Sequence, residues 1–481
     1  MVPASIISDD ETPGDPVRCT FIPPYLLDHL AAAAAPSPAA ASGRSTLVLD
    51  RRLREQRTAP SVLPRVRSLR ADAPAQRRVV HSAGGTETLP GTPVRSDGDP
   101  VSGDAAVDEA FDSSGQVWDL FAEVFDRRSV DGEGTTLSIT VHYGERYDNA
   151  FWDGSQLVFG DGDGEVFERF TKPMDVMAHE FTHGVTQFSA GLTYQGQSGA
   201  LNESVSDVFA ALTEQRVQGQ DAASADWLIG KGLFRPGVAA RALRSMLEPG
   251  TAYDDPRLGR DPQVGSMADY VVTEEDNGGV HLNSGIPNRA FALAAVALGG
   301  PSWERAGRVW YDTLTGGQIG ADVDFVGFAE ATVASAQQLF ADEPEVATQV
   351  RTGWVQVGVL AAVDDGQVAP APPAPVDAAP PVPGVPAAGA RTVAVRRSGG
   401  FTGGVRAGEL DLDGDPQGPQ VRQLLLDTDL TRLAGSAPAP DRFVYTVDVG
   451  DWHLTVPEQD LTPELDQVVR IVLGGGRLDL G

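Results

Sequence analysis

The chain has 481 residues, a formal net charge of −30 and a hydrophobic fraction of 41%. This length exceeds one ordinary domain, so we expect two or three folded units, and the hydrophobic fraction is enough for packed cores. The acidic balance argues against nucleic acid as a partner, because a phosphate backbone requires clustered Lys and Arg.

Residues 1–78 combine a small apolar island, Cys19–Leu27, with an Ala/Pro/Ser stretch and a basic run. This is too little apolar material for an independent core, so we expect a segment that docks on the rest of the chain. The first 17 residues lack a basic start followed by an apolar run, which predicts a cytoplasmic location or export by a non-classical route. The alanine run 31–35 is too short for a membrane span, and no membrane partner is expected. Cys19 is the single cysteine, so no intramolecular disulfide can form.

Residues 79–361 show strand patterns first and helical patterns later. Leu137–Tyr143 alternates like a strand, and the short apolar run Leu157–Gly160 ends in a Gly/Asp turn. Apolar periodicity then predicts helices over residues 174–189, 201–216, 287–298 and 325–340. This order predicts an α+β protein with two lobes, a β-rich lobe over 79–173 and a helical lobe over 174–361.

The last part of the chain is predicted to be a linker and a small domain. Residues 362–390 are rich in Pro and Ala, which is typical of a semi-rigid extended linker. Strand patterns return at residues 391–395 and 442–447, and a helical pattern follows at 463–473. We therefore expect a separate α/β domain over 391–481.

The pattern His179-Glu180-Phe181-Thr182-His183 carries metal chemistry. Histidines four residues apart lie on one face of a helix and can bind one metal ion, while Glu180 is turned aside and can deprotonate a zinc-bound water. A catalytic zinc needs a third protein ligand, and Glu203 on the next helix could supply it. An isolated pattern of this kind can also arise by chance, so the pattern alone does not decide whether a metal is bound.

Two polar residues flank Glu203 on the predicted second helix. Asn202 and Asp207 could orient the two histidines from outside the metal shell. The alternative for Asp207 is an ordinary exposed helix acid.

A third polar cluster, Glu275–Gly285, is Gly-rich and centred on His281. In this order the motifs resemble those of the thermolysin family of neutral metalloproteases, over residues 79–361: Tyr147–Trp152, Gly160–Gly164, His179–His183, Gly199–Asp207 and Asp276–Gly285. The resemblance implies a two-lobed zinc endopeptidase. It also implies that His281, held by Asp276, and Tyr194 donate hydrogen bonds to the oxyanion of the tetrahedral intermediate.

The resemblance further implies a set of substrate-binding residues. Arg244 would bind a substrate carbonyl, and the strand at Asn149 and Ala150 would pair with the substrate backbone. An apolar pocket would accept the residue after the scissile bond, which predicts cleavage before bulky hydrophobic residues; its lining would be Val176, Ile229 and Leu243. Plain core packing is the alternative for the last two.

Calcium is where the sequence departs from the family. Asp175, Glu214 and Asp226 match part of the double calcium site of large secreted members, whereas other residues stand where further acids would be: Leu228, Lys231 and Gly232. Two adjacent divalent ions need about five or six carboxylates. We therefore expect no double site, and a single calcium ion is left open.

Both flanking segments also resemble known elements. The Cys19–Leu27 island resembles the short propeptide of the protealysin branch, which implies an inhibitory, folding-assisting segment in the active-site cleft and cleavage in the basic stretch before Val79. Cys19 would either ligate the zinc of the latent form or anchor the island as a buried thiol. Residues 391–481 are similar to emfourin, an inhibitor of such enzymes, which implies self-inhibition.

Three alternatives are kept beside this interpretation. The C-terminal domain could be an adhesion or substrate-binding module instead of an inhibitor. The peptidase could be an inactive zinc-bound platform, although Glu180, Tyr194 and His281 are all present. The C-terminal domain could itself be the functional part, which the peptidase only processes. For the location, the resemblance to the family implies that the protein acts outside the cell.

Overall fold

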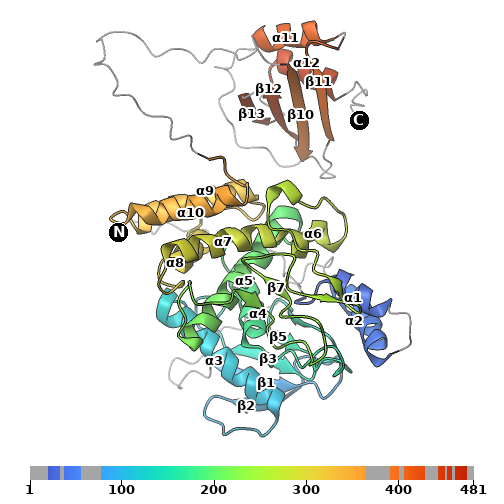
Figure 1. Cartoon of the computed structure of the whole chain (residues 1–481), viewed down its shortest axis with the longest axis vertical. Coiled ribbons are helices and arrows are strands. Elements are labelled where there is room, and N and C mark those ends of the chain that lie inside the picture. Colours follow the sequence, from blue (N-terminus) through green and yellow to red (C-terminus); the bar gives the residue numbers. More distant parts are fainter. Residues whose placement is uncertain are drawn as a thin grey trace, which may run out of the picture. The chain divides into compact units, whose positions relative to one another are not determined.

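The computed structural model describes residues 20–32, 37–55, 77–362, 391–399, 406–415, 417–427, 443–449, 452–457 and 461–473. Contacts divide the chain into two units, Met1–Asp365 and Gly366–Gly481, which are described separately (Figure 1). Cys19 and the predicted linker, apart from residue 362, lie outside the described residues. The boundaries proposed for lobes, linker and domains stay predictions.

A mixed five-stranded sheet forms the first lobe. Its order is β2-β1-β3-β5-β4, in which β1, β3 and β5 run parallel and the two edge strands run antiparallel to their neighbours. Strand β4 therefore offers a free edge toward the rest of the unit. The strands are β1 Arg78–Ser82, β2 Thr92–Ser96, β3 Leu137–Val141, β4 Ala150–Trp152 and β5 Leu157–Phe159.

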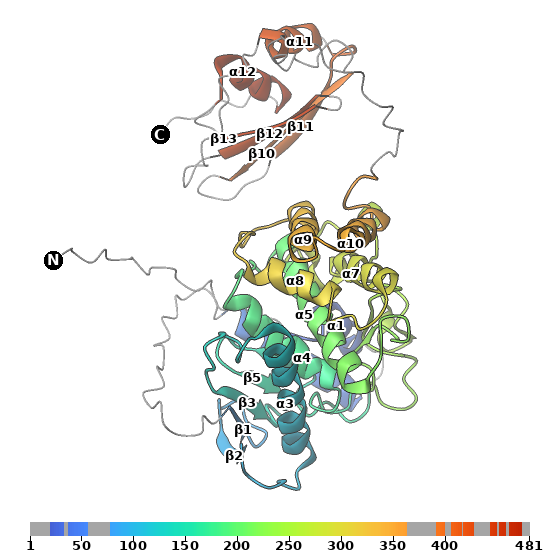
Figure 2. The same cartoon turned by 90° about the vertical axis from the view of Figure 1, so that its left-hand side faces the viewer.

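Helix α3, Ala105–Phe125, packs against this sheet (Figure 2). The Asp104 side chain caps it by accepting hydrogen bonds from the N–H groups of Ala106 and Val107. Its buried positions, which include Val107, Phe111 and Phe121, recur at helical spacing. The expectation of strands first and helices later is therefore wrong here, because a long helix lies between β2 and β3.

Two long helices, α4 (Met174–Gln187) and α5 (Gly196–Gln218), pack against each other at the centre of the unit. Nearly every residue of α4 is buried, so this helix has no solvent-facing side. Gly184 allows its close approach to the first lobe, since a Cβ there would lie 2.7 Å from Cγ1 of Val130. The helix is thus rigidly placed between the lobes.

The second lobe is helical, as predicted. Trp310 stacks on Trp354 with ring centroids 5.9 Å apart, and Phe291 meets Trp310 edge-on at 4.9 Å. Short strand pairs and a 3₁₀ turn link the helices. The elements are α6 Asp276–Asn283, α7 Gly285–Leu298, α8 Ala306–Thr315, α9 Phe325–Leu339, α10 Pro344–Gln356, β6 Leu228–Ile229, β7 Arg244–Ser245, β8 Asp254–Asp255, β9 Gly259–Arg260 and the 3₁₀ turn Met267–Asp269.

The N-terminal segment forms two helices, α1 (Pro24–Ala31) and α2 (Pro38–Glu55), which pack together. Pro24 starts α1, where its missing N–H costs no hydrogen bond. Leu26, Leu27 and Leu30 are buried and belong to the same hydrophobic core as residues of both lobes. The segment is therefore docked, as its scarce apolar content predicts.

The described residues of the second unit form a four-stranded antiparallel sheet and two helices. Its order is β11-β10-β12-β13, and Figure 2 shows both helices on one side of the sheet. Gly408 lets helix α12 approach closely, since a Cβ there would lie 2.3 Å from the carbonyl oxygen of Val472. The elements are β10 Thr392–Gly399, β11 Arg406–Asp411, β12 Phe443–Val449, β13 Trp452–Pro457, α11 Gly418–Asp427 and α12 Pro463–Val472.

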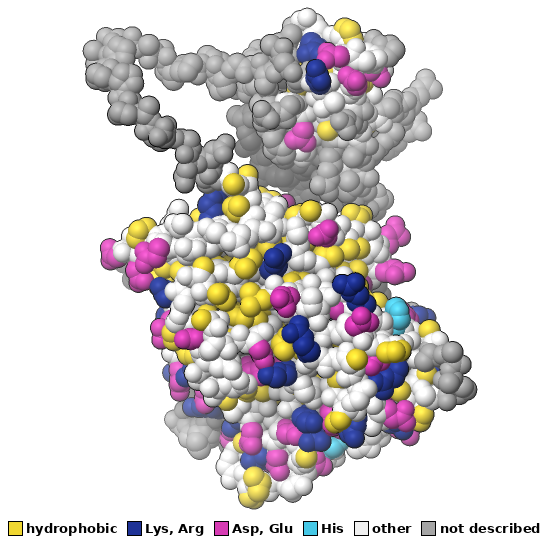
Figure 3. All heavy atoms as spheres, in the orientation of Figure 1, with side chains coloured by type: hydrophobic (Ala, Val, Ile, Leu, Met, Phe, Trp, Pro, Cys, Tyr) yellow, Lys and Arg dark blue, Asp and Glu magenta, His cyan; other side chains and the backbone are white. Residues whose placement is uncertain are grey.

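Two properties of the surface bear on possible partners. Within the described residues, no helix combines the length and apolar character that crossing a membrane requires. On the face that Figure 3 shows, Lys and Arg side chains are interspersed with Asp and Glu side chains over the first unit. The expectation that nucleic acid is not a partner stays a prediction.

Candidate metal centre and substrate cleft

Three buried side chains from α4 and α5 meet at one point. The Nε2 atoms of His179 and His183 lie 3.0 Å apart, and the carboxylate oxygens of Glu203 lie 3.5 Å and 3.6 Å from these two nitrogens. Tetrahedral zinc with Zn–N bonds of about 2.0–2.1 Å separates two ligand atoms by roughly 3.3 Å. Among the His, Cys, Asp and Glu side chains of the described residues, these are the only three or more that lie close enough together to share one ion. Their donor atoms therefore fit zinc.

The outer nitrogen of each histidine is held by another side chain. Nδ1 of His179 lies 2.8 Å from Oδ1 of Asp207, and Nδ1 of His183 lies 2.8 Å from Oδ1 of Asn202. Each ring is thereby turned so that Nε2 faces the shared point, as the predicted outer-shell roles require. The alternative that Asp207 is an exposed helix acid is wrong, because its side chain is fully buried.

Asp207 also binds residues from two other elements. Its carboxylate accepts hydrogen bonds from Nε and Nη2 of Arg244, at 2.8 Å and 2.7 Å, and from Nδ2 of Asn288 at 2.8 Å. Burial opposes ionisation of this carboxylate, but the charge of Arg244 and the hydrogen bond to His179 lower the pKa of Asp207 to about 2. Asn288 was not predicted from the sequence, although an amide within an apolar helical pattern is a detectable signal.

Glu180 lies beside this cluster in a fully buried position. Neither of its carboxylate oxygens makes a well-formed hydrogen bond within the described residues. Burial raises the pKa of Glu180 to about 8. A divalent cation nearby would favour the charged form and lower that pKa. The residue thus has the environment of a group that exchanges protons near neutral pH.

Two further side chains, those of Tyr194 and His281, lie beside the Glu203 carboxylate. The hydroxyl of Tyr194 donates to Oε1 of Glu203 and lies 3.5 Å from Nε2 of His281. Nδ1 of His281 lies 2.7 Å from Oδ1 of Asp276, whose other oxygen accepts from the backbone N–H of His281 at 2.9 Å. Burial disfavours protonation of this imidazole, but the charge of Asp276 raises the pKa of His281.

The local sequence explains how His281 reaches this position. Residues 276–279, Asp-Asn-Gly-Gly, all have positive φ, between 50° and 82°. Asp, Asn and Gly are the residues that tolerate this left-handed conformation best. The turn places the carboxylate of Asp276 within hydrogen-bonding distance of the backbone N–H and of the Nδ1 atom of His281.

The N-terminal segment occupies the cleft between these groups and strand β4. Thr20 pairs with Phe151 as an antiparallel bridge, and the N–H of Phe21 donates to the carbonyl of Ala150 at 3.0 Å. Asn149 both accepts from the N–H of Ile22, at 2.7 Å, and donates to its carbonyl, at 3.2 Å. The segment therefore extends the sheet at its free edge.

The side chain of Phe21 is fully buried beside the metal cluster. Its ring meets the ring of His179 edge-on at 5.1 Å, and the guanidinium carbon of Arg244 lies 4.8 Å from its centroid. A Cβ added at Gly230 would lie 3.6 Å from Cε1 of Phe21 and 2.9 Å from Cβ of Leu243. The three side chains predicted to line a pocket belong to the same buried core as Phe21: Val176, Ile229 and Leu243.

The acids matched to calcium, Asp175, Glu214 and Asp226, do not belong to the group of side chains that could share the metal ion. Asp175 accepts a hydrogen bond from the N–H of Gly230 at 2.6 Å, and Asp226 forms an ion pair with Lys231. Burial and the charge of Glu214 raise the pKa of Asp175. Within the described residues these three acids do not together form a group close enough to share an ion. Calcium binding there stays a prediction.

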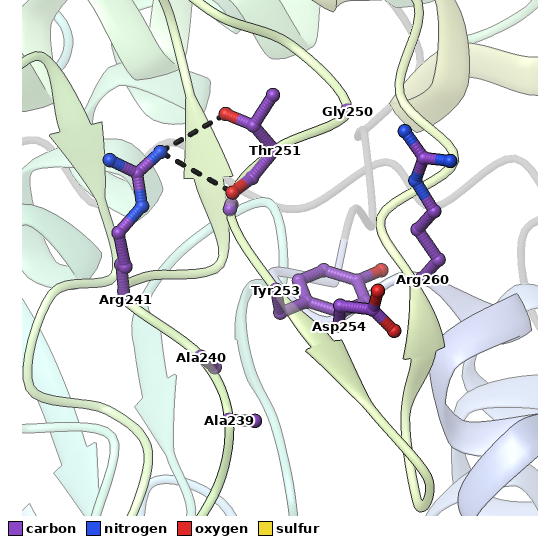
Figure 4. A pocket seen from close by; sticks show the side chains of 9 residues that line it. Ala239, Ala240, Arg241, Gly250, Thr251, Tyr253, Asp254 and Arg260 are labelled. Carbon is purple, nitrogen blue, oxygen red and sulfur yellow. Dashed lines mark hydrogen bonds between the residues drawn. The ribbon is translucent and has the colours of Figure 1, made fainter.

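A separate hollow of about 550 Å³ opens beside strands β8 and β9. Figure 4 shows Arg241 donating to Thr251 at its edge, with Tyr253, Asp254 and Arg260 around it. It shares no residue with the metal cluster, and the cleft itself is filled by Thr20–Ile22.

Comparison with known proteins agrees with this geometry. The thermolysin metallopeptidase catalytic domain matches residues 71–187, and the alpha-helical domain of the same peptidases matches residues 190–359. An extracellular metalloprotease of Pectobacterium carotovorum is 48% identical over 341 residues, which are 71% of this chain and 96% of the relative. The chain belongs to the thermolysin family.

Two further matches refine the position within the thermolysin family. Protease PrtS of Photorhabdus is 47% identical over 290 residues, which are 60% of this chain and 78% of the relative. The solved precursor of protealysin from Serratia proteamaculans matches with a TM-score of 0.64 and 48% identity, over 71% of this chain and all of that one. The emfourin family matches residues 395–473.

The chain is thus a zinc metalloendopeptidase of the protealysin type with a C-terminal emfourin domain. The predicted family, α+β fold class, enzyme class and zinc cofactor are confirmed. The similarity to a protease precursor and to the emfourin family also supports peptide substrates and a regulatory relation to the chain's own N-terminal segment and emfourin domain.

Proposed function

We propose that this zinc endopeptidase cleaves on the amino side of bulky hydrophobic residues and that it is made as a precursor inhibited by its own N-terminal segment. The observation that supports both parts is the placement of Phe21 beside His179, with its backbone paired to strand β4. A substrate that took the same path would place one large apolar side chain in that buried position.

Glu180 is the proposed general base. When bound by His179, His183 and Glu203, zinc supplies Lewis acidity that polarises the substrate carbonyl and makes a water molecule more acidic. The Glu180 carboxylate takes a proton from the attacking water and passes it to the leaving nitrogen. Asn202 and Asp207 keep the two imidazoles in the required orientation.

His281 and Tyr194 are the proposed stabilisers of the developing charge. Nε2 of His281 and the hydroxyl of Tyr194 donate hydrogen bonds to the carbonyl oxygen as it becomes negative, and Asp276 holds the His281 ring in place. Each such preorganised donor contributes on the order of 3–4 kcal/mol to lowering the barrier.

Substrate binding is assigned to the groups that hold the N-terminal segment. Arg244 would bind the carbonyl of the residue after the scissile bond, as it approaches the carbonyl of Phe21 at 3.3 Å. Asn149 and Ala150 would pair with the substrate backbone, and the apolar pocket would be lined by Val176, Ile229 and Leu243. Digestion of a peptide library, with the cleavage sites identified by mass spectrometry, tests this specificity. Cleavage without enrichment of large apolar residues after the cut bond would contradict it.

Glu180→Gln tests the assigned mechanism. The substitution keeps the shape of the side chain but removes the base, so turnover should fall by at least about 100-fold while zinc stays bound. Glu109→Gln is the matched control, because Glu109 pairs with Arg169 on the first lobe, outside the cleft. Full turnover in Glu180→Gln, or loss of zinc from it, would show that the role is wrong.

If residues 1–78 are an inhibitory propeptide, Cys19 either binds the zinc of the latent form or anchors the segment as a buried thiol. X-ray absorption at the zinc edge of the uncleaved precursor distinguishes them. A sulfur ligand would indicate that Cys19 binds the metal in the latent form, whereas a shell of nitrogen and oxygen alone would leave the thiol with an anchoring role.

The emfourin domain is proposed to inhibit the mature enzyme, in its own chain or in a second copy. Because Thr20–Ile22 fill the cleft of the precursor, the domain can reach the cleft only after they leave. The linker would keep its effective concentration high. Adding isolated residues 391–481 to the processed and truncated enzyme tests this. Absence of inhibition at micromolar concentration would favour the adhesion or substrate-binding alternative.

Action outside the cell is the proposed location. A relative that is 48% identical is named an extracellular metalloprotease. Fractionation of the producing cells, with detection of the peptidase in medium and cytoplasm, tests this.

A further inference from the structure

One peptide unit of the N-terminal segment is held at both of its polar atoms. The carbonyl oxygen of Thr20 lies 3.1 Å from Nε2 of His281. The N–H that follows it, on Phe21, donates to the carbonyl oxygen of Ala150 at 3.0 Å. These two groups belong to the amide that joins Thr20 to Phe21.

The same amide lies at the metal cluster. Nε2 of His281, which contacts the Thr20 carbonyl, is itself 3.4 Å from Oε2 of Glu203. On the other side of the amide, the ring of Phe21 lies 5.1 Å from the ring of His179. The carbonyl of Thr20 thus faces the groups that stabilise negative charge, and the next side chain enters the apolar site.

The following residues keep the segment in this register. The carbonyl of Phe21 faces Nη1 of Arg244 at 3.3 Å, and both backbone groups of Ile22 are bound by Asn149. The chain also runs antiparallel to strand β4. Shifting it by one residue would exchange which backbone groups and which side chains face these partners.

From this register we propose that the enzyme cleaves its own chain between Thr20 and Phe21, in addition to any cut that separates residues 1–78 from the peptidase. The proposal rests on the function proposed above. The bond between the carbonyl carbon of Thr20 and the nitrogen of Phe21 breaks. The oxygen of water joins that carbon, and Glu180 carries the water proton to the nitrogen of Phe21, which leaves as the amine.

The cut does not by itself empty the cleft. The fragment that begins at Phe21 keeps its buried leucines in the core of the unit. Helix α2 also holds it, since Thr46 accepts from the N–H of Asp148 at 3.0 Å and Asp50 accepts from Asn149 at 3.0 Å. The new amino terminus therefore stays at the metal cluster as a bound product. Activation requires a second step that removes this fragment.

Mass spectrometry of the zinc-loaded full-length precursor in ¹⁸O-labelled water tests the proposal. The expected result is a chain that begins at Phe21 and a released peptide that ends at Thr20 and carries one ¹⁸O atom. The rate should not depend on protein concentration if the bond is cut within the same chain. Glu180→Gln should give neither product.

Substitutions of Phe21 test the register. Phe21→Leu should retain the cut, because it keeps a large apolar side chain at the buried site. Phe21→Asp should slow it by at least about 100-fold, because a carboxylate would enter an apolar site. A synthetic peptide of residues 17–31, offered to the processed enzyme, is the measurement that does not depend on folding of these variants; it should be cut between Thr20 and Phe21.

An external peptide with a central phenylalanine separates two kinds of failure. If the processed enzyme cleaves it, but the precursor never yields a chain beginning at Phe21 and the 17–31 peptide is cut elsewhere or not at all, the self-cleavage proposal is wrong. If zinc-loaded processed enzyme cleaves neither peptide, the proposed function is wrong.

Discussion

Asp207→Asn perturbs a side chain that joins His179, a predicted metal ligand, to Arg244, a proposed substrate-binding residue. The carboxylate accepts from His179, from two nitrogens of Arg244 and from Asn288, all within 2.8 Å, and it is fully buried. An amide keeps the volume, but it removes the negative charge and turns one acceptor into a donor. That donor would face the N–H groups of Arg244 or Asn288.

The expected magnitude follows from the burial of this ion pair. The side chain of Arg244 is 2% exposed, so the variant leaves a buried cation without its counter-ion. Breaking a buried pair in this way costs about 3–5 kcal/mol of unfolding free energy. Loss of an outer-shell partner of a metal-bound histidine typically lowers metal affinity by about 10–100-fold. Both losses should appear in one protein.

Asp97→Asn is the matched control. Asp97 also accepts two hydrogen bonds from one guanidinium group, that of Arg78, besides the backbone N–H groups of Arg77 and Arg78. Its side chain is 27% exposed, and Asp97 follows β2 at the opposite edge of the sheet from β4. Solvent compensates much of such a change, so we expect a loss of about 1 kcal/mol and wild-type zinc affinity.

The assay combines unfolding and zinc competition. Both substitutions are made in Glu180→Gln, so that self-cleavage does not interfere with unfolding. Urea unfolding followed by tryptophan fluorescence reports on the first unit, because six of the seven tryptophans precede residue 362. Zinc affinity is measured against a chromophoric chelator. Equal losses in Asp207→Asn and Asp97→Asn, or wild-type zinc affinity in Asp207→Asn, would refute the reasoning.

Three further predictions concern the metal and the two flanking segments. Chelation of zinc should abolish turnover and lower the urea midpoint, since three buried ligands lose their shared ion, and re-added zinc should restore both; full activity in the chelator would contradict the metal role. Truncation after residue 365 should raise activity on a small peptide once residues 1–78 are removed, and unchanged activity would argue against self-inhibition. Burial and the nearby Asp163 raise the pKa of Asp148 under helix α2, although Ser42 and Arg146 offset part of this. When helix α2 covers it, the Asp148 carboxyl group is therefore protonated. Retention of the cleaved N-terminal segment, measured by gel filtration, should weaken as the pH rises above the ordinary Asp pKa of about 4. Asp148→Asn should remove this pH dependence. The same pH dependence in the variant would show that another group is responsible.

The sequence alone determined the parts of this protein that depend on short spacings. His179 and His183 share a helix face because they are four residues apart, and the pattern around Glu203 marks the third member of the cluster. The helices of the second lobe were predicted from apolar residues at helical spacing, whereas the two central helices are buried on almost every side, so little of their polar and apolar pattern records a solvent-facing surface. Helix α3 has the same periodicity, so it too was predictable. The positive φ run at residues 276–279 uses the residue types that tolerate it.

Only the tertiary structure decided which distant groups meet in the cleft. The contacts of Thr20 with His281, Phe21 with Arg244 and Ile22 with Asn149 join positions separated by 261, 223 and 127 residues. No local pattern encodes such a separation, because side-chain periodicity reports which face is buried and not what it is buried against. The same holds for the contacts of Asp207 with Arg244 and Asn288. The register that places the Thr20–Phe21 amide at the metal cluster is therefore a property of packing, set by the edge of strand β4 and the docking of helices α1 and α2.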